Sequence, residues 1–124
     1  MSATPPFDAD FVARFGLPVK QFDAGEKIFL EDDTGAQMYL VLSGKVSILT
    51  YGSVLENAGP QTTFGEMALI EDAPRSASAL AIEPTEVAVI DKRAFLELVR
   101  LEPSFSLYVM RLLAARLRRM NDSL

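Results

Sequence analysis

FGEMALIEDAPRSASA, residues 64–79, places a Gly-Glu pair, a short run of helix-forming residues, a turn and an arginine in close succession. Gly65 has no Cβ, so the backbone there can approach a ligand closely. Residues 66–69 favour a single helical turn, whose free N–H groups would face Gly65 and could bind an anion. Arg75 follows Glu66 by nine residues, and its guanidinium can bind two phosphate oxygens at once. Because the same anion would repel Glu66, we expect this carboxylate to accept a hydrogen bond from a sugar hydroxyl.

The whole string resembles the phosphate-binding cassette of cyclic nucleotide-binding domains, the fold of the catabolite activator protein and of the regulatory domains of cyclic-nucleotide-dependent kinases and channels. The pattern in that family is F-G-E, a small apolar helix, and then an arginine followed by small or hydroxyl residues. The residues that match it are Phe64, Gly65, Glu66, Ala68, Leu69, Arg75, Ser76 and Ala77. A second string, AGEKIFLEDDTGAQMYLVLSGKVSIL at residues 24–49, resembles the first half of the barrel of this family. The resemblance covers roughly residues 15–120.

The resemblance implies a role for each polar residue of the cassette. Glu66 would bind the ribose 2′-hydroxyl of a cyclic nucleotide, and Arg75 and the Ser76 hydroxyl would bind its cyclic phosphate. The backbone N–H groups that would complete the phosphate site belong to Gly65, Met67 and Ala68. The expected ligand is cAMP or cGMP, between which the sequence does not decide, and no other cofactor is expected.

The resemblance also implies an apolar base site and a moving helix. Val54 and Phe64 are expected to line the base, and Arg116 is the candidate to stack on it. In this family a C-terminal helix swings towards the nucleotide and closes over the base, which requires that the ligand interact better with the closed state than with the open one. The alternatives are that both C-terminal helices simply cover the open side of the barrel, or that the apolar stripe of the last helix forms a dimer seam.

The composition limits the class of protein. The chain has 124 residues, of which 49% are hydrophobic and 23% charged, as expected for a single domain over residues 1–124. The net charge of −5 disfavours direct binding to nucleic acid, and no apolar run approaches the roughly 20 residues that cross a membrane. Cysteine and histidine are absent, which excludes thiol nucleophiles, disulfides and the usual zinc sites and fits a cytoplasmic location. We expect no catalytic residue and no metal site, and we interpret the acidic residues 31–33 as a solvated turn.

The pattern of apolar and turn residues predicts a mainly β fold with flanking helices. We expect an antiparallel β-roll, a jelly-roll-like barrel at about residues 19–90, with a short N-terminal helix, a short cassette helix and two C-terminal helices at about 91–121. Residues 1–6 are expected to be a loose end. The expected strands are 19–22, 27–30, 38–42, 46–51, 54–57, 76–82 and 85–90, and the N-terminal helix is expected at 8–15.

Both C-terminal helices have predicted caps and apolar faces. Asp91 is the expected N-cap of the first helix, which ends before Pro103 and has its apolar face at Phe95, Leu96, Leu98 and Val99. Ser104 is the expected cap of the last helix, which runs to about Met120. Its apolar stripe steps by threes and fours through Phe105, Tyr108, Val109, Leu112, Leu113, Leu117 and Met120.

These observations leave a leading function and two alternatives. The leading one is a cyclic nucleotide sensor module that is not an enzyme. Because the given sequence shows no segment for DNA binding, channel or kinase activity, we expect its readout to pass through a protein partner, a homodimer or a domain outside this sequence. The second is a ligand-free interaction or dimerisation module of the same fold, paired through Phe105, Tyr108, Leu112 and their neighbours. The third, an enzyme that uses Glu66, lacks an evident nucleophile or activated water.

Overall fold

The computed structural model describes residues 7–122, so the loose end predicted at residues 1–6 lies outside the described residues. The strands are β1 (Val19–Phe22), β2 (Lys27–Phe29), β3 (Gln37–Ser43), β4 (Val46–Thr50), β5 (Ser53–Ala58), β6 (Thr63–Phe64), β7 (Ser78–Ala81) and β8 (Thr85–Asp91). The helices are α1 (Ala9–Arg14), α2 (Glu66–Glu71), α3 (Lys92–Leu101) and α4 (Pro103–Asp122). Within this range, no helix is both long and apolar enough to span a membrane.

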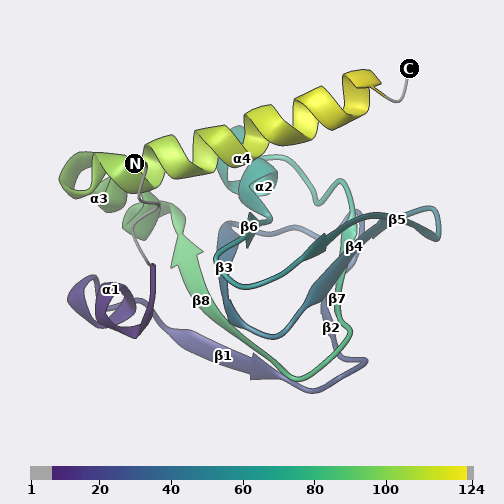
Figure 1. Cartoon of the computed structure of the whole chain (residues 1–124), viewed down its shortest axis with the longest axis horizontal. Helices are drawn as coiled ribbons and strands as arrows, with labels where there is room; N and C mark the ends of the chain where they lie inside the picture. Colours follow the sequence, from purple (N-terminus) through teal and green to yellow (C-terminus); the bar gives the residue numbers. More distant parts are fainter. Residues whose placement is uncertain (1–6, 123–124) are drawn as a thin grey trace.

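The strands form two four-stranded antiparallel sheets, in the orders β1-β8-β3-β6 and β2-β7-β4-β5. Figure 1 shows the strands forming a roll, with the long α4 running across one side of it, α2 below α4 in this view, and α1 and α3 near the N-terminal end of α4. This arrangement confirms the antiparallel β-roll with flanking helices that the sequence predicted. The two-residue strand β6 is an addition, because so short a segment has no recognisable pattern of its own.

Helices α1 and α3 begin after an aspartate that caps them, and α4 begins at a proline. The Asp8 carboxylate accepts hydrogen bonds from the first turn of α1, and the Asp91 carboxylate accepts one from the Ala94 N–H at 2.8 Å, as predicted for α3. The predicted cap at Ser104 is wrong, because α4 already begins at Pro103. Proline suits the first helical position, where its missing N–H would have had no partner in the helix.

The central strand β8 is buried on both faces, which explains its nearly continuous apolar sequence. Val87 and Val89 point into the roll interior, a core that also contains Tyr39 and Phe64. The alternate residues Ala88 and Ile90 belong to a second core between the sheet and the helices. The buried aromatic residues and Leu98 of this helix-side core come from α1, α3, α4 and the chain before α1. Each fully buried side chain of this size contributes roughly 1.5–3 kcal/mol relative to an exposed one.

The first half of α4 is fixed to the body of the domain. Phe105 is fully buried, and its ring lies 5.0 Å from that of Phe7. The Tyr108 hydroxyl donates to the Gln61 carbonyl, and the Gln61 side chain binds both the N–H and the carbonyl of Phe7. Phe105 therefore faces the core and not the solvent, which removes it from the alternative dimer seam, whereas a seam formed by the other residues of the stripe stays untested.

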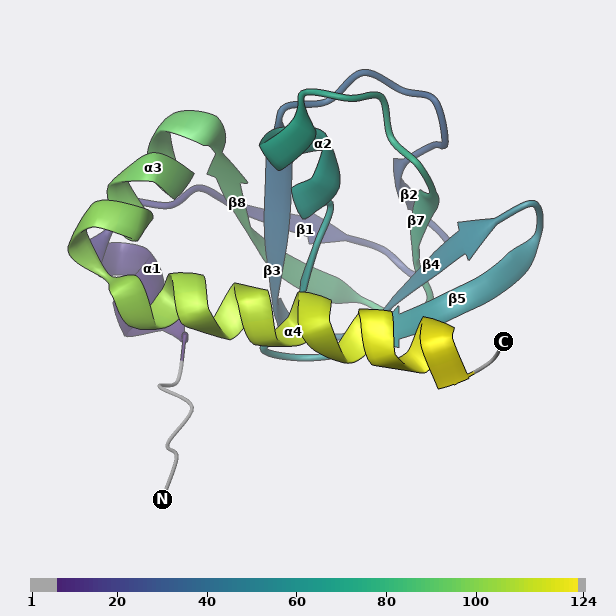
Figure 2. The same ribbon diagram turned by 90° about the horizontal axis from the view of Figure 1, so that it is seen from above.

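The second half of α4 passes beyond this core and lies along the mouth of the roll near β5 (Figure 2). Leu117 and Met120 are 61% and 64% exposed, although the sequence predicted that they would continue the apolar face. Leu96 and Val99 of α3 are also exposed, so only part of its predicted apolar face is buried. Helical periodicity identified the apolar stripes of α3 and α4. How much of each stripe is buried depends on which elements lie opposite the helix.

Candidate functional site

A pocket of about 500 Å³ opens between α2, β5 and the second half of α4. This volume suits a drug-sized or nucleotide-sized ligand. All nine residues that the sequence nominated line it, namely Val54, Phe64, Gly65, Glu66, Met67, Ala68, Arg75, Ser76 and Arg116. The sequence did not nominate the other lining residues, which are Phe29, Ile48, Leu55, Glu56, Ala77, Arg119 and Met120.

Arg75 forms the cationic side of the pocket. Arg75 is only 4% exposed. Its Nη1 and Nη2 donate to the Gly65 and Gln37 carbonyls, respectively, at 2.8 Å each. The guanidinium carbon lies 4.1 Å from the centre of the Phe29 ring, a cation–π arrangement. Within residues 7–122 no carboxylate forms an ion pair with it, and burial lowers the pKa of Arg75. A buried guanidinium with two neutral acceptors is a strong site for an anion.

The backbone around Gly65 brings the cassette close to this guanidinium. Gly65 caps α2 in the left-handed conformation, with φ of 81°, which a residue with a Cβ rarely adopts. An added Cβ would lie 2.9 Å from Nη1 of Arg75. Ala68 and Leu69 anchor the short helix in the core, whereas Met67 is half exposed at the pocket. The predicted role of Gly65, close approach of backbone to the site, therefore has a geometric reason.

Gly35 covers the opposite side of the Arg75 side chain and is not predicted by the cassette string. A Cβ at this position would meet Nε, Nη2 and Cζ of Arg75 at 2.6, 2.7 and 2.8 Å. The absence of a side chain at Gly35 thus leaves the space that the guanidinium fills.

We expect Gly35→Ala to displace the Arg75 guanidinium and to weaken binding of an anionic ligand about tenfold, roughly the value of one hydrogen bond to a charged group. Gly59→Ala is the matched control, because no atom lies within 4 Å of a Cβ added there. Isothermal titration of both variants with the ligand of the wild type checks this. Wild-type affinity in Gly35→Ala would show that Arg75 does not need this exact placement.

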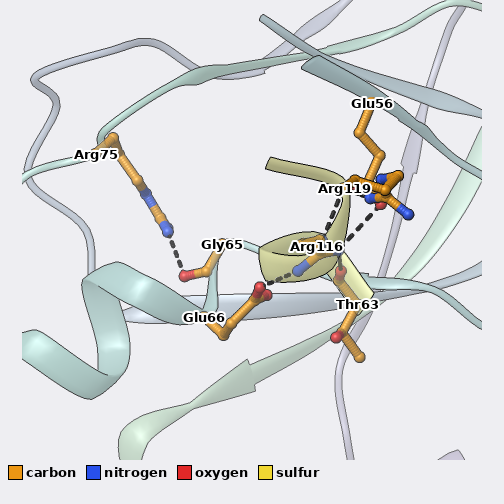
Figure 3. Close-up of polar contacts among 7 residues, drawn as sticks. All are labelled: Glu56, Thr63, Gly65, Glu66, Arg75, Arg116 and Arg119. Carbon is orange, nitrogen blue, oxygen red and sulfur yellow. Dashed lines mark hydrogen bonds and ion pairs between the residues drawn. The ribbon is translucent and has the colours of Figure 1, made fainter. Parts of the chain in front are cut away.

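Four charged residues meet on the other side of the pocket (Figure 3), namely Glu56, Glu66, Arg116 and Arg119. Arg119 Nη2 lies 3.4 Å from Oε1 of Glu56. Arg116 Nε and Nη2 donate to the two carboxylate oxygens of Glu56 at 2.7 and 3.2 Å. Nη2 also donates to the Thr63 carbonyl at 2.5 Å, and Nη1 donates to Oε1 of Glu66. Figure 3 shows Arg75 bonded to Gly65 apart from this cluster. In the structure Arg116 thus binds two carboxylates. The sequence had suggested instead that it would stack on a base.

Burial sets the protonation behaviour of this cluster. Burial raises the pKa of Glu66, and the Arg116 charge acts in the opposite direction. Although burial alone would lower the pKa of Arg116, the hydrogen bond to Glu56 and the charges of both glutamates raise it overall. The charge and the hydrogen bond of Arg116 thus favour the ionised form of Glu66, although burial keeps the pKa of Glu66 raised overall.

The pocket combines an anion site, a carboxylate and apolar walls. Arg75 can bind an anion, Glu66 can accept from a hydroxyl, and Phe29, Ile48 and Val54 offer surface to a flat ring. Within the described residues no group of three or more acidic side chains is placed to hold a metal ion. Such a combination suits a small molecule with a phosphate, a sugar and a base.

One missed residue carried a signal in the sequence. Glu56 follows Val54 by two positions in a predicted strand, where alternate residues tend to share a face. An acidic residue beside a predicted apolar wall was therefore a candidate for the pocket. Phe29 and Arg119 carried no comparable signal, because they reach the site from elements whose placement depends on the whole fold.

The sequence is similar to those of characterised proteins. A family described as "Cyclic nucleotide-binding domain" matches residues 19–102. The cyclic AMP receptor protein of Thermus thermophilus is 38% identical over 102 residues, which are 78% of this chain and 47% of that protein. The cAMP-dependent protein kinase regulatory subunit of Yarrowia lipolytica is 38% identical over 79 residues, which are 64% of this chain and 21% of that protein. The chain thus spans less than half the length of these relatives.

The fold is similar to that of a solved structure as well. The crystal structure of the Thermus thermophilus catabolite activator protein gives a TM-score of 0.79 at 34% identity and covers 92% of this chain and 55% of that chain. The family match at residues 19–102 includes the cassette but ends before α4. The contribution of α4 to the pocket therefore rests on the geometry of Arg116, Arg119 and Met120.

Proposed function

The chain belongs to the cyclic nucleotide-binding domain family, and from this premise we propose that its pocket binds cAMP or cGMP and that the domain acts as a regulatory sensor. The observation that carries the proposal is Arg75. It is a buried cation that lines the pocket beside Gly65 and forms no ion pair within the described residues. A cyclic phosphate would supply the negative charge that matches it.

In the proposed complex each part of the nucleotide has a partner. Arg75, the Ser76 hydroxyl and the N–H groups of Gly65, Met67 and Ala68 bind the cyclic phosphate. Glu66 accepts from the ribose 2′-hydroxyl, and its deep burial favours a ligand donor. Val54 and Phe64 contribute apolar surface, so that the base lies towards β5 and the second half of α4.

The same contacts suggest how binding is read out. Arg116 and Met120 bring α4 to the pocket, and we propose that the nucleotide changes the position or the population of this helix. A ligand shifts such an equilibrium only by its difference in affinity for the two positions. The exposed residues Leu107, Met110 and Leu117 on α4 support a protein contact on its outer side, with a homodimer or another partner. Direct binding to nucleic acid or to a membrane forms no part of the proposal.

Thermal unfolding of the purified domain tests the proposal. At about 100 times its Kd a ligand stabilises the folded state by about 2.7 kcal/mol, so cAMP or cGMP should raise the melting temperature by several degrees. Adenosine and guanosine, which lack the phosphate, are the controls and should have little effect. The absence of a shift with both cyclic nucleotides would contradict the proposal and favour the ligand-free interaction module.

Three further points stay predictions. We propose that residues 1–124 act as a single domain, that they catalyse no reaction, and that they act in the cytoplasm. The absence of histidine and cysteine from the sequence supports the second point.

A further inference from the structure

We propose that Glu56 is a positioning residue for the ribose, because it orients Arg116 and Arg116 in turn holds one oxygen of Glu66 while the other stays available to the 2′-hydroxyl. This inference rests on the proposed function of the pocket. According to this inference, residues of β5 and α4 contribute to recognition of the ribose, in addition to Glu66 of the cassette.

The first step is the ion pair in which both oxygens of Glu56 bind Arg116. Both oxygens of Glu56 accept from the same edge of the guanidinium, at 2.7 Å from Nε and 3.2 Å from Nη2. The Thr63 carbonyl accepts from Nη2 as well. Because a guanidinium is planar and rigid, fixing Nε and Nη2 also fixes the direction of Nη1. Nη1 is the atom that donates to Glu66.

The second step is the state of the Glu66 carboxylate. Its side chain is 4% exposed, and it lines the pocket. Oε1 accepts from Arg116, whereas Oε2 is buried and has no hydrogen-bond partner among the described residues. A buried carboxylate oxygen without a donor is unfavourable. A ligand hydroxyl at Oε2 would remove this cost without displacing Arg116 from Oε1.

The third step is the consequence of removing the Glu56 charge. Without the two hydrogen bonds to Glu56, the Arg116 guanidinium can rotate. It can then present two N–H groups side by side to Glu66, the carboxylate that remains. An edge-on guanidinium binds both oxygens of a carboxylate, so it would occupy Oε2 as well. Arg75, on the other side of the pocket, makes no hydrogen bond or ion pair with Glu56 among the described contacts. Loss of Glu56 should thus affect recognition of the sugar and leave the phosphate site in place.

The test compares two ligands on each of three proteins. Isothermal titration gives the affinity of the full chain for the preferred cyclic nucleotide and for its 2′-deoxy analogue, in the wild type, Glu56→Gln and Glu71→Gln. We expect the wild type to prefer the 2′-hydroxyl form about tenfold or more, the scale of one hydrogen bond to a charged group. In Glu56→Gln the preference should fall to about twofold if the bond to the carboxylate is largely lost. Glu71→Gln removes the same charge from an exposed position of α2 and should keep the wild-type preference.

The ratio of the two affinities isolates the role of Glu56. A changed net charge or a partly unfolded sample alters the binding of both ligands alike, so their ratio does not move. A wild-type ratio in Glu56→Gln, or a wild type without a preference, would overturn the positioning role while leaving cyclic nucleotide binding intact. Failure of the wild type to bind either nucleotide would instead overturn the proposed function, and this inference with it.

Discussion

Replacement of Arg75 by alanine is expected to lower the affinity for cyclic nucleotide by about 100-fold or more, because two hydrogen bonds between a guanidinium and a phosphate are lost together. Arg75 is the buried cation of the pocket, and Arg116, the other largely buried arginine that lines it, is engaged by Glu56 and Glu66. Arg119 also lines the pocket, but its Nη2 lies 3.4 Å from Oε1 of Glu56. Each of the other guanidinium groups that line the described pocket is therefore already paired with a carboxylate. Isothermal titration of the variant with cAMP and cGMP measures the loss.

Two controls separate binding from folding in this experiment. Arg75→Ala also leaves the Gly65 and Gln37 carbonyls without their donor, so its thermal unfolding must be measured beside the titration. Arg75→Lys keeps the charge but not the two-pronged geometry, and we expect intermediate affinity from it. Arg100→Ala removes the same charge from an exposed position on α3 and should bind almost normally. Wild-type affinity in a folded Arg75→Ala protein would show that the nucleotide binds elsewhere.

Replacement of Gly44 by alanine is expected to lower the free energy of unfolding by about 3 kcal/mol, a sum of backbone strain and overpacking. Gly44 turns the chain between β3 and β4 with φ of +93°, in the left-handed region that disfavours a Cβ. The added Cβ would also lie 2.4 Å from both the Pro84 carbonyl and the Thr85 hydroxyl. Pro84 ends the turn before β8 and Thr85 is the first residue of β8, so these atoms have little freedom to move away.

Gly52→Ala provides a control that contains only one of the two effects. Gly52 also has a positive φ, +78°, but no atom lies within 4 Å of its added Cβ. We expect Gly52→Ala to cost about 1–2 kcal/mol from backbone strain alone. Urea unfolding of both variants compares the two values. Equal losses in Gly44→Ala and Gly52→Ala would mean that contact between the β3–β4 turn and the β7–β8 turn contributes nothing to stability.

The parts of the fold that the sequence predicted are those determined by local patterns. Strand β1 begins and ends where it was expected, and Asp91 caps α3 as predicted. The cassette is also local, since a glycine with positive φ and a short apolar helix need only neighbouring residues. For that reason this one stretch of sequence nominated seven of the sixteen residues that line the pocket.

The parts that the sequence did not predict depend on contacts between distant elements. Glu56 and Glu66 meet at Arg116 only because α4 crosses the mouth of the roll, and Arg116 lies 14 residues beyond the end of the family match at residue 102 (116 − 102 = 14). The exposure of Leu117 likewise follows from where the core ends beneath α4. Helical periodicity gives the face of a helix but not the length over which that face is covered.

The difference between the two arginines of the pocket illustrates the same limit. Arg75 was predicted from its place in the cassette, and its contacts with the Gly65 carbonyl lie within that stretch. Arg116 was predicted from its position on the last helix alone, so its partners were not foreseen. Its pairing with Glu66 links the sugar side of the pocket to α4, and the Glu56 inference follows from that link.

Cyclic nucleotide binding is decided by isothermal titration of the wild-type chain, freed of any bound nucleotide and shown to be folded. With cAMP and then cGMP as titrants, we expect saturable one-to-one binding of at least one of them, and the ratio of the two affinities identifies the preferred ligand. Flat traces with both nucleotides would rule out the proposed sensor, because a folded pocket with Arg75 in place would then have no affinity for the ligand that its chemistry fits.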